Sequence, residues 1–175
     1  MARTFSSSTI VPRGFVIQDV RIDPEMLTVV VRHESSTAAC PSCGTASSKI
    51  HSRYRRSPMD LPLGGRRVQL SIVTRRFRCG SVLCGRQIFA ERFPDDVLAA
   101  SARRTSRLDH VVHHLGLALG GRPAADFARR LLMPVSNDTL LRVVRRRAQV
   151  PREPLNVIGI DDWAWRRNHR YGTIV

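Results

Sequence analysis

Two close pairs of cysteines constrain this chain more than any other feature of its sequence. The first pair lies in the segment Cys40-Pro41-Ser42-Cys43-Gly44 and the second in Cys79-Gly80-Ser81-Val82-Leu83-Cys84, and the chain has no other cysteine. The 35 residues between the pairs are basic and read as strands. Two short loops of this kind can supply the four thiolates of a tetrahedral Zn²⁺ site. We therefore predict one structural zinc bound by Cys40, Cys43, Cys79 and Cys84, because four protein thiolates leave no position for water or substrate.

Two alternatives to this site remain open from the sequence alone. The cysteines could be free and partly buried, although such residues would not need to fall into two close pairs. His51 lies between the pairs and could replace one thiolate, but its neighbours, Ser52 to Tyr54, look like strand surface. Residues 1–9 contain no apolar run of signal-peptide length, so we expect a reducing, cytoplasmic compartment that favours thiolates over disulfides.

The charge of the chain is strongly positive and unevenly distributed. The formal net charge is +15, and Lys49 is the one lysine among 29 basic residues. Residues 40–90 hold ten basic side chains and one acidic, whereas residues 101–150 hold ten basic and three acidic. Two separated basic blocks are typical of a surface that binds phosphates. A membrane partner is disfavoured, because no apolar run reaches about 18 residues and no long amphipathic helix is rich in Trp and Phe.

Alternating apolar residues predict a β-rich N-terminal half. Residues 15–20 and 27–32 read as two strands that form a small sheet. Residues 66–78 read as a ribbon strand, in which Val68, Leu70 and Ile72 alternate with polar side chains. A hairpin turn is expected at Leu61-Pro62-Leu63-Gly64-Gly65.

Arginines of the cysteine segment are expected on the outer surface of its sheet. They are Arg53, Arg55, Arg56, Arg66, Arg67, Arg75, Arg76 and Arg78. We predict that Arg75 and Arg76 contact DNA phosphates.

Two helices are predicted after the locally acidic segment 91–100. Apolar residues recur at helical spacing from Leu108 to Leu119, and Gly120-Gly121 ends this helix. His110 and His114 lie four residues apart on it, but no third ligand accompanies them, so we read them as surface histidines. Pro123 suits the first turn of a second helix, and we assign its inward face to Phe127, Ala128 and Leu131.

A third helix, at about residues 136–148, carries the pattern of a recognition helix. Ser136 is a natural N-cap, the apolar stripe is Leu140, Val143 and Val144, and the opposite face is polar and basic. Three helices with a tight turn before the last one predict a helix-turn-helix. The residues predicted to contact DNA are Thr139 and Arg142 at base edges, and Arg145 and Arg146 at phosphates. A helical hairpin with a solvated basic face is the alternative.

The final segment, residues 157–175, reads as a buried strand, a turn near Arg167-Asn168 and a second strand. Asp161 and Asp162 follow the apolar run of the first strand. A carboxylate fixed by a strand suits a divalent metal ion, although successive strand residues point to opposite faces and would not serve the same ion. Aspartates in such places more often cap turns.

Taken in order, these segments resemble the transposases of the ISL-three group of bacterial insertion sequences. The resemblance covers about residues 40–175 and is carried by CPSCG, HSRYRRSPMDLPLGGRRVQL, RRFRC-x₄-C, RQIFAERF, PVSNDTLLRVVRR and IGIDDWAWRRNHRYGTIV. It implies an N-terminal zinc ribbon, a helix-turn-helix that binds terminal inverted repeats, and a ribonuclease-H-like DDE domain. In such domains three acidic residues hold two divalent ions, Mg²⁺ or Mn²⁺, that act on phosphodiesters.

The resemblance implies a catalytic role for Asp161, which matches the Asp of the family's GID strand motif. Asp162 stands where the family often has another acid and is a second candidate. The second Asp and the final Glu of the family should lie well downstream of Val175. We therefore expect a catalytically incomplete transposase fragment that binds DNA and does not cut it.

The sequence thus predicts an α+β fold in four parts: a tail and small strand pair at 1–39, a zinc ribbon at 40–94, a three-helix helix-turn-helix region at 95–150, and the first hairpin of a ribonuclease-H-like domain at 151–175. The expected partner is double-stranded DNA at transposon ends, in a bacterial, nucleoid-associated protein, and a homo-oligomer on DNA is compatible with this. The alternative is a stand-alone zinc-ribbon and helix-turn-helix regulator, which has no need of the GIDDWAWRRNHRYGT segment. An RNA-binding ribbon is a remoter reading.

Overall fold

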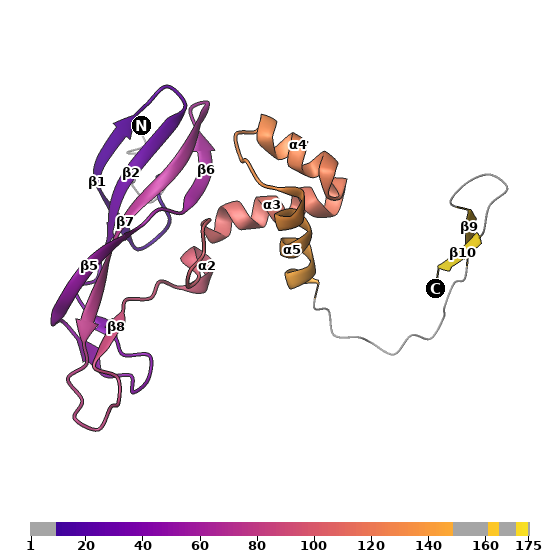
Figure 1. Cartoon of the computed structure of the whole chain (residues 1–175). Coiled ribbons are helices and arrows are strands. Elements are labelled where there is room, and N and C mark those ends of the chain that lie inside the picture. Colours follow the sequence, from indigo (N-terminus) through magenta and orange to yellow (C-terminus); the bar gives the residue numbers. More distant parts are fainter. Residues whose placement is uncertain (1–9, 149–160, 165–170, 175) are drawn as a thin grey trace, which may run out of the picture. The chain divides into compact units, whose positions relative to one another are not determined.

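The computed structural model describes residues 10–148, and the backbone of residues 161–164 and 171–174. The chain forms two compact units, Met1–Val144 and Arg145–Val175. The first unit is mixed α+β, with a β-rich N-terminal part followed by helices (Figure 1). None of the helices in the described part of the chain has the length and apolar character needed to cross a bilayer.

One six-stranded sheet organises the β-rich part. Its strands are β1 (Phe15–Ile22), β2 (Met26–His33), β5 (Ile50–Arg56), β6 (Met59–Leu63), β7 (Arg66–Arg78) and β8 (Ile88–Ala90). The 13-residue strand β7 is the spine, because β2, β5, β6 and β8 all pair with it. β2 runs parallel to β7, while β5, β6 and β8 run antiparallel to it. The two predicted N-terminal strands therefore belong to the same sheet as the cysteine segment.

The turn between β6 and β7 lies within the predicted segment but is shorter than predicted, because Leu61 to Leu63 belong to strand β6. Leu63 pairs with Arg66, so Gly64 and Gly65 alone form the loop. Both have positive φ, at 57° and 72°. Two-residue hairpin loops of this kind need positive φ at both positions, which glycine adopts without a steric penalty.

The apolar face of the sheet is covered by the segment after β8. Val68, Leu70 and Ile72 of β7, the apolar residues of the predicted alternation, are buried beside Val29 and Val31 of β2. They pack with Phe93 and with α2 (Asp95–Leu98) in one core cluster. The part of this face around Val68, Leu70 and Ile72 is closed to solvent, so binding surfaces of the sheet must lie outside it.

The three predicted helices are present as α3 (Ser106–Leu119), α4 (Arg122–Arg130) and α5 (Asn137–Arg147). The ends of α3 and the start of α5 follow the usual capping chemistry. The Thr105 hydroxyl accepts a hydrogen bond from Leu108 N at the start of α3, and Gly120 ends it with a φ of 73°. The Ser136 hydroxyl accepts from Thr139 N at 3.3 Å and caps α5.

The inward face of α4 differs from the prediction. Phe127 and Leu131 are exposed, whereas Ala124 and Ala128 are fully buried. Small residues on this face allow α4 to pack in one cluster with Leu108 of α3 and Leu140 of α5. Apolar spacing identified the helix correctly, but the bulkiest side chains were wrongly placed in the core.

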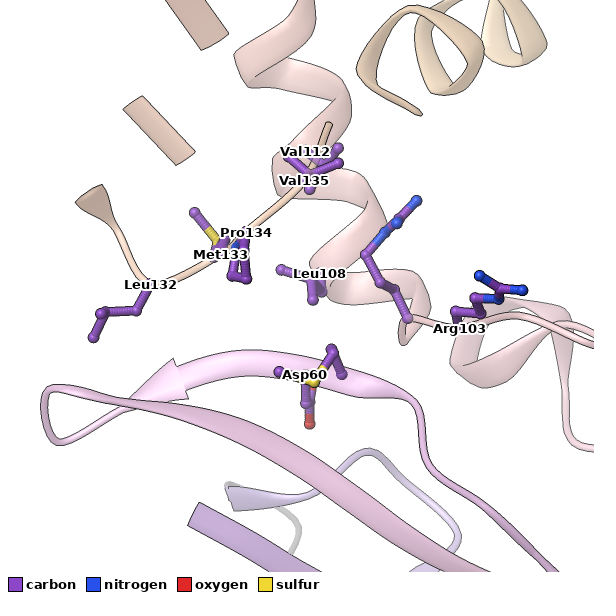
Figure 2. Close-up of a pocket in the computed structure, with 10 residues that line it drawn as sticks. Asp60, Arg103, Leu108, Val112, Leu132, Met133, Pro134 and Val135 are labelled. Carbon is purple, nitrogen blue, oxygen red and sulfur yellow. The ribbon is translucent and has the colours of Figure 1, made fainter. Parts of the chain in front are cut away.

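A buried carboxylate connects the sheet to the helices. Asp60 of β6 accepts hydrogen bonds from Thr105 Oγ1 at 2.6 Å and from Arg107 Nε at 2.8 Å. The backbone of Met59 also exchanges hydrogen bonds with Arg103 O and Thr105 N, each at 2.9 Å. A cavity of about 130 Å³ lies beside this contact, bounded by β6, α3 and the turn before α5 (Figure 2). Strand β6 and the N-terminus of α3 are thus joined through both backbone and side chains.

The second unit contains one described strand pair. β9 (Asp161–Ala164) and β10 (Tyr171–Ile174) are antiparallel, with Asp161 opposite Ile174 and Asp162 opposite Thr173. The predicted apolar run before Asp161 and the turn near Arg167-Asn168 lie outside the described residues.

Candidate metal centre and nucleic-acid interface

The first cysteine loop, Cys40–Cys43, which we name the first knuckle, lies in a small hairpin. Strands β3 (Ala38–Ala39) and β4 (Ala46–Ser47) pair on either side of it. Gly44 N donates to Cys40 O at 2.8 Å, and Cys40 N donates to Thr45 O at 2.9 Å. Gly44 has a φ of 74°, a conformation that favours glycine. These bonds turn both sulfurs toward the second cysteine loop.

The second knuckle, Cys79–Cys84, connects the end of β7 to β8. Arg78 pairs with Ile88, and Cys79 N donates to Gln87 O at 2.8 Å beyond this pair. Cys84 N donates to Ser81 O at 3.3 Å and closes a turn within the loop. One end of this knuckle is therefore attached to β7, the strand with the most pairing partners in the sheet.

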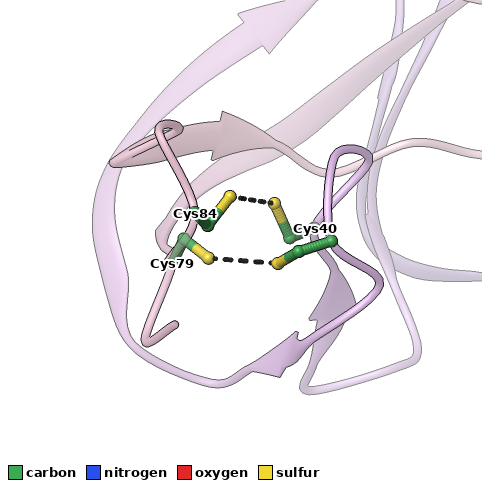
Figure 3. A group of neighbouring side chains, drawn as sticks. Cys40, Cys79 and Cys84 are labelled. Atoms are coloured by element: carbon green, nitrogen blue, oxygen red, sulfur yellow. Dashed lines mark hydrogen bonds between the residues drawn. The ribbon is translucent and has the colours of Figure 1, made fainter. Parts of the chain in front are cut away.

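The two knuckles bring all four sulfurs together, as Figure 3 shows. The four Sγ atoms lie within 4.8 Å of one another. Cys40 Sγ is 3.9 Å from Cys84 Sγ, and Cys43 Sγ is 3.6 Å from Cys79 Sγ. A tetrahedron with Zn–S bonds of about 2.3 Å has S···S edges of about 3.8 Å. A disulfide needs about 2.05 Å, so this spacing fits four metal-bound thiolates and not two bridges.

The protonation of these thiols also favours a bound cation. Hydrogen bonds from the hydroxyl and backbone amide of Thr45 lower the pKa of the Cys43 thiol to about 6. A backbone hydrogen bond from Ser81 lowers the pKa of Cys79, but burial and the neighbouring thiols outweigh it and raise this pKa to about 12. Four thiols this close do not ionise together unless a positive charge compensates them. Zn²⁺ supplies that charge, so the donor set and its spacing support a structural Zn²⁺.

A small aromatic core supports the cysteine cluster. Phe77 and Phe89 are buried, and their rings stack with centroids 5.9 Å apart. Cys40 is buried in the same cluster, with Cys79 and Cys84 packed against it. A core of this size is too small to hold two loops by apolar burial alone, which is the usual reason for a structural metal.

The histidines weighed from the sequence lie away from the cysteine cluster. His51 Nδ1 contacts the Ser52 hydroxyl at 3.1 Å on the exposed surface of β5. His110 Nε2 and His114 Nε2 are 3.1 Å apart on exposed α3. In the part of the chain that the structure describes, the four cysteines are the group of three or more metal-ligating side chains that come together.

Arg75, one of the arginines predicted to contact phosphates, forms a buried ion pair within the chain. Its guanidinium binds the Glu91 carboxylate through Nε at 3.0 Å and Nη2 at 2.5 Å, and Nη2 also donates to Ser35 O at 2.7 Å. The side chains of Arg75 and Glu91 are 14% and 2% exposed. The Glu91 carboxylate therefore neutralises the charge of Arg75. These bonds connect β7 to the loop after β2 and to the residue after β8.

Other sheet arginines do face solvent. Arg76 is exposed and lies over the Tyr54 ring at 4.6 Å from its centroid. On the opposite face of the sheet, Arg32 and Arg55 both pair with Val73, from β2 and β5, and all three side chains point the same way. Arg32, Arg53 and Arg55 are exposed and form no ion pair among the described residues. We name these three residues the sheet-face arginines.

The predicted recognition helix presents its arginines to solvent. Arg142, Arg145 and Arg146 are exposed on α5, while Leu140 and Val143 are buried. Thr139 is half-buried, and its hydroxyl accepts a hydrogen bond from Ser136 Oγ at 2.9 Å. Asp161 is the first residue of β9 and Asp162 the second.

The second knuckle carries a feature that the sequence reading missed. Val82 and Leu83 are each 99% exposed at its tip. The signal in the sequence was an apolar pair between two metal-ligating cysteines, where polar or glycine turn residues are usual.

Comparison with known proteins identifies the cysteine region. Residues 36–84 match the family model described as the zinc-finger of transposase IS204/IS1001/IS1096/IS1165. No curated protein and no solved structure matches the chain. The matched range contains both knuckles and the whole of β5, β6 and β7, the strands between them. Residues 36–84 are therefore similar to the zinc ribbon of these ISL3-type transposases.

Proposed function

We propose that this chain is the DNA-binding part of an insertion-sequence transposase, and that it recognises the terminal inverted repeats of its element. The observation that carries the proposal is the transposase zinc-ribbon match at residues 36–84, in a unit that also contains α3, the basic helix α4 and most of the basic helix α5. Zinc in this account is structural: it holds the knuckles and leaves DNA contact to the surrounding arginines.

Sequence recognition is assigned to α5, as the second helix of a helix-turn-helix formed with α4. Residues 131–136 form the short connection, and Met133 within it is buried in the helical core. A recognition helix needs one apolar side for packing and one polar side for base edges. Arg142 and Thr139, near the N-terminal half of α5, are proposed to contact bases, and Arg145 and Arg146 to contact phosphates.

Sequence-independent affinity is assigned to the sheet. Arg76 and the sheet-face arginines are exposed cations without an acidic partner among the described residues. Each phosphate neutralised by such a side chain releases counterions, so these contacts strengthen binding at low salt. Arg75 leaves this group because Glu91 already neutralises it.

Asp161 is proposed as a metal-binding carboxylate of a ribonuclease-H-like DDE domain, with Asp162 as the second candidate. The paired strands β9 and β10 are compatible with the first hairpin of such a domain. In that setting Mg²⁺ or Mn²⁺ would bind Asp161 together with further carboxylates and would activate the attacking oxygen. DNA cleavage by this chain alone is not part of the proposal.

The proposal is tested by selection from a pool of short DNA duplexes with a randomised centre, using the zinc-loaded full chain. We expect enrichment of one sequence motif, and loss of that enrichment in Arg142→Ala with binding of unselected duplex retained. Arg122→Ala is a matched control, because Arg122 is an exposed arginine on α4. Failure to enrich any motif over unselected duplex would contradict recognition by α5.

The stand-alone regulator remains the second candidate, because it requires the same ribbon and helices. The two functions differ in the expected target. A transposase part should select a sequence present at both ends of the element that encodes it, in inverted orientation, whereas a regulator should select sites beside promoters.

A further inference from the structure

The tip of the second knuckle is a turn with apolar residues at positions where polar residues or glycine are usual. Cys84 N donates to Ser81 O at 3.3 Å, so Val82 and Leu83 occupy the two central positions of this turn. Such positions favour Gly, Pro, Asn, Asp and Ser. The first knuckle follows that preference, with Pro41 and Ser42 between its cysteines. A local conflict of this kind, without a packing reason, is expected at a functional site.

No packing reason exists among the described residues. Val82 and Leu83 are both 99% exposed, whereas the next most exposed large apolar side chain, Ile22, is 69% exposed. Cys79 and Cys84, on either side of the tip, belong to the four-sulfur cluster. A metal bound there would hold the two apolar side chains in a fixed, outward position.

The segments that lead into the two knuckles are basic. Lys49, Arg78 and Arg86 are exposed and form no ion pair among the described residues. Arg86 Nε also donates to Ser42 Oγ at 2.8 Å, which places its charge between the two knuckles. From Ser35 to Ala90 the one acidic residue is Asp60, which is buried and bound to Arg107.

We propose that Val82 and Leu83 form an apolar wedge that inserts between base pairs of double-stranded DNA, while the surrounding cations bind the adjacent phosphates. The inference rests on the DNA binding proposed above. Apolar wedges that unstack a base step are used by proteins that bind the minor groove and bend DNA. The basic surroundings favour a polyanion, and the similarity of residues 36–84 to a transposase zinc finger favours DNA over other anionic surfaces.

The test compares the zinc-loaded chain with Val82→Ser and Leu83→Ser on selected duplexes that carry 2-aminopurine at successive positions. We expect the wild type to raise 2-aminopurine fluorescence at one step, which reports unstacking, and each variant to abolish that rise. Affinity should fall at least tenfold (about 1.4 kcal/mol). The slope of log affinity against log salt should stay unchanged, because no charge is removed.

Three controls separate the outcomes. Leu83→Met keeps an apolar tip and should retain the fluorescence rise, and Leu117→Ser changes an exposed leucine of α3 and should behave as the wild type. If Leu83→Ser binds the duplex and unstacks it as the wild type does, the wedge is overturned. It is also overturned if the substitution changes only self-association of the chain or its binding to phosphatidylserine vesicles. If the wild type binds no duplex, the proposed function itself fails, so the two failures are distinguishable.

Discussion

The guanidinium of Arg75 and the carboxylate of Glu91 form a buried ion pair that joins β7 to the residue after β8. Arg75 N also donates to Glu91 Oε1 at 2.7 Å, so the carboxylate is held by both the side chain and the backbone of one residue. Arg75 precedes the second knuckle in the chain and Glu91 follows it, so the pair joins the two strands that carry this knuckle. It assigns Arg75 to stability.

Arg75→Ala should lower the free energy of unfolding by about 3 kcal/mol, because it leaves the Glu91 carboxylate buried without its partner. Arg76→Ala is the matched control: Arg76 is exposed, so stability should change by less than about 1 kcal/mol while DNA affinity falls. Urea unfolding and duplex titration measure the two effects. A stable Arg75→Ala with a smaller salt slope would instead make Arg75 the phosphate contact expected from the sequence.

Asp60→Ala should destabilise the chain by about 3 kcal/mol, since it removes the acceptor for Thr105 and Arg107 at the start of α3. Hydrogen exchange should become faster in the first turn of α3. Asp126→Ala removes an exposed ion pair with Arg129 on α4 and should cost less than about 0.5 kcal/mol. Equal effects of the two substitutions would contradict a connecting role for Asp60.

Gly116→Ala tests the close packing of α3 against α5. A Cβ at Gly116 would lie 2.7 Å from Val144 Cγ2, so the substitution should destabilise by about 1 kcal/mol despite the better helix propensity of alanine. In a Val144→Ala background, which removes that methyl group, Gly116→Ala should become stabilising. A double-mutant cycle by thermal unfolding measures this change of sign, and its absence would mean that the helices are not in contact here.

Arg145→Ala should weaken binding to all duplexes similarly and reduce the salt slope by about 1, as expected for a phosphate contact. Arg142→Ala should relax sequence preference, with a loss of about 1–3 kcal/mol on the selected duplex. Anisotropy titrations at several salt concentrations separate the two. Arg142→Ala with unchanged preference would remove Arg142 from the base-reading role.

Local patterns in the sequence predicted the turns, helix caps and strand alternation, because these features depend on residues close together in the chain. The turn at Gly64 and Gly65, the cap at Ser136 and the alternation of Val68, Leu70 and Ile72 all follow from spacing and turn chemistry. The two knuckles were found because ligand spacing is local and the cysteines are few.

Features that depend on distant partners were not predictable in the same way. The pairing of β2 with β7, the burial of Arg75 by Glu91 and the exposure of Phe127 all depend on which residues meet across the fold. The spacing of apolar residues identifies the apolar face of a helix or strand, but not the element against which that face packs. It also gave no reason to expect an apolar pair, Val82 and Leu83, entirely in solvent.

The central claim is that Cys40, Cys43, Cys79 and Cys84 hold one structural zinc. Native mass spectrometry of the full chain, prepared with equimolar Zn²⁺ under reducing conditions, tests it most directly. The account predicts one zinc per chain with four thiol protons displaced, and loss of that zinc together with folded structure in Cys40→Ser. A metal-free, folded chain, whether with four free thiols or with Cys40–Cys84 and Cys43–Cys79 disulfides, would contradict it.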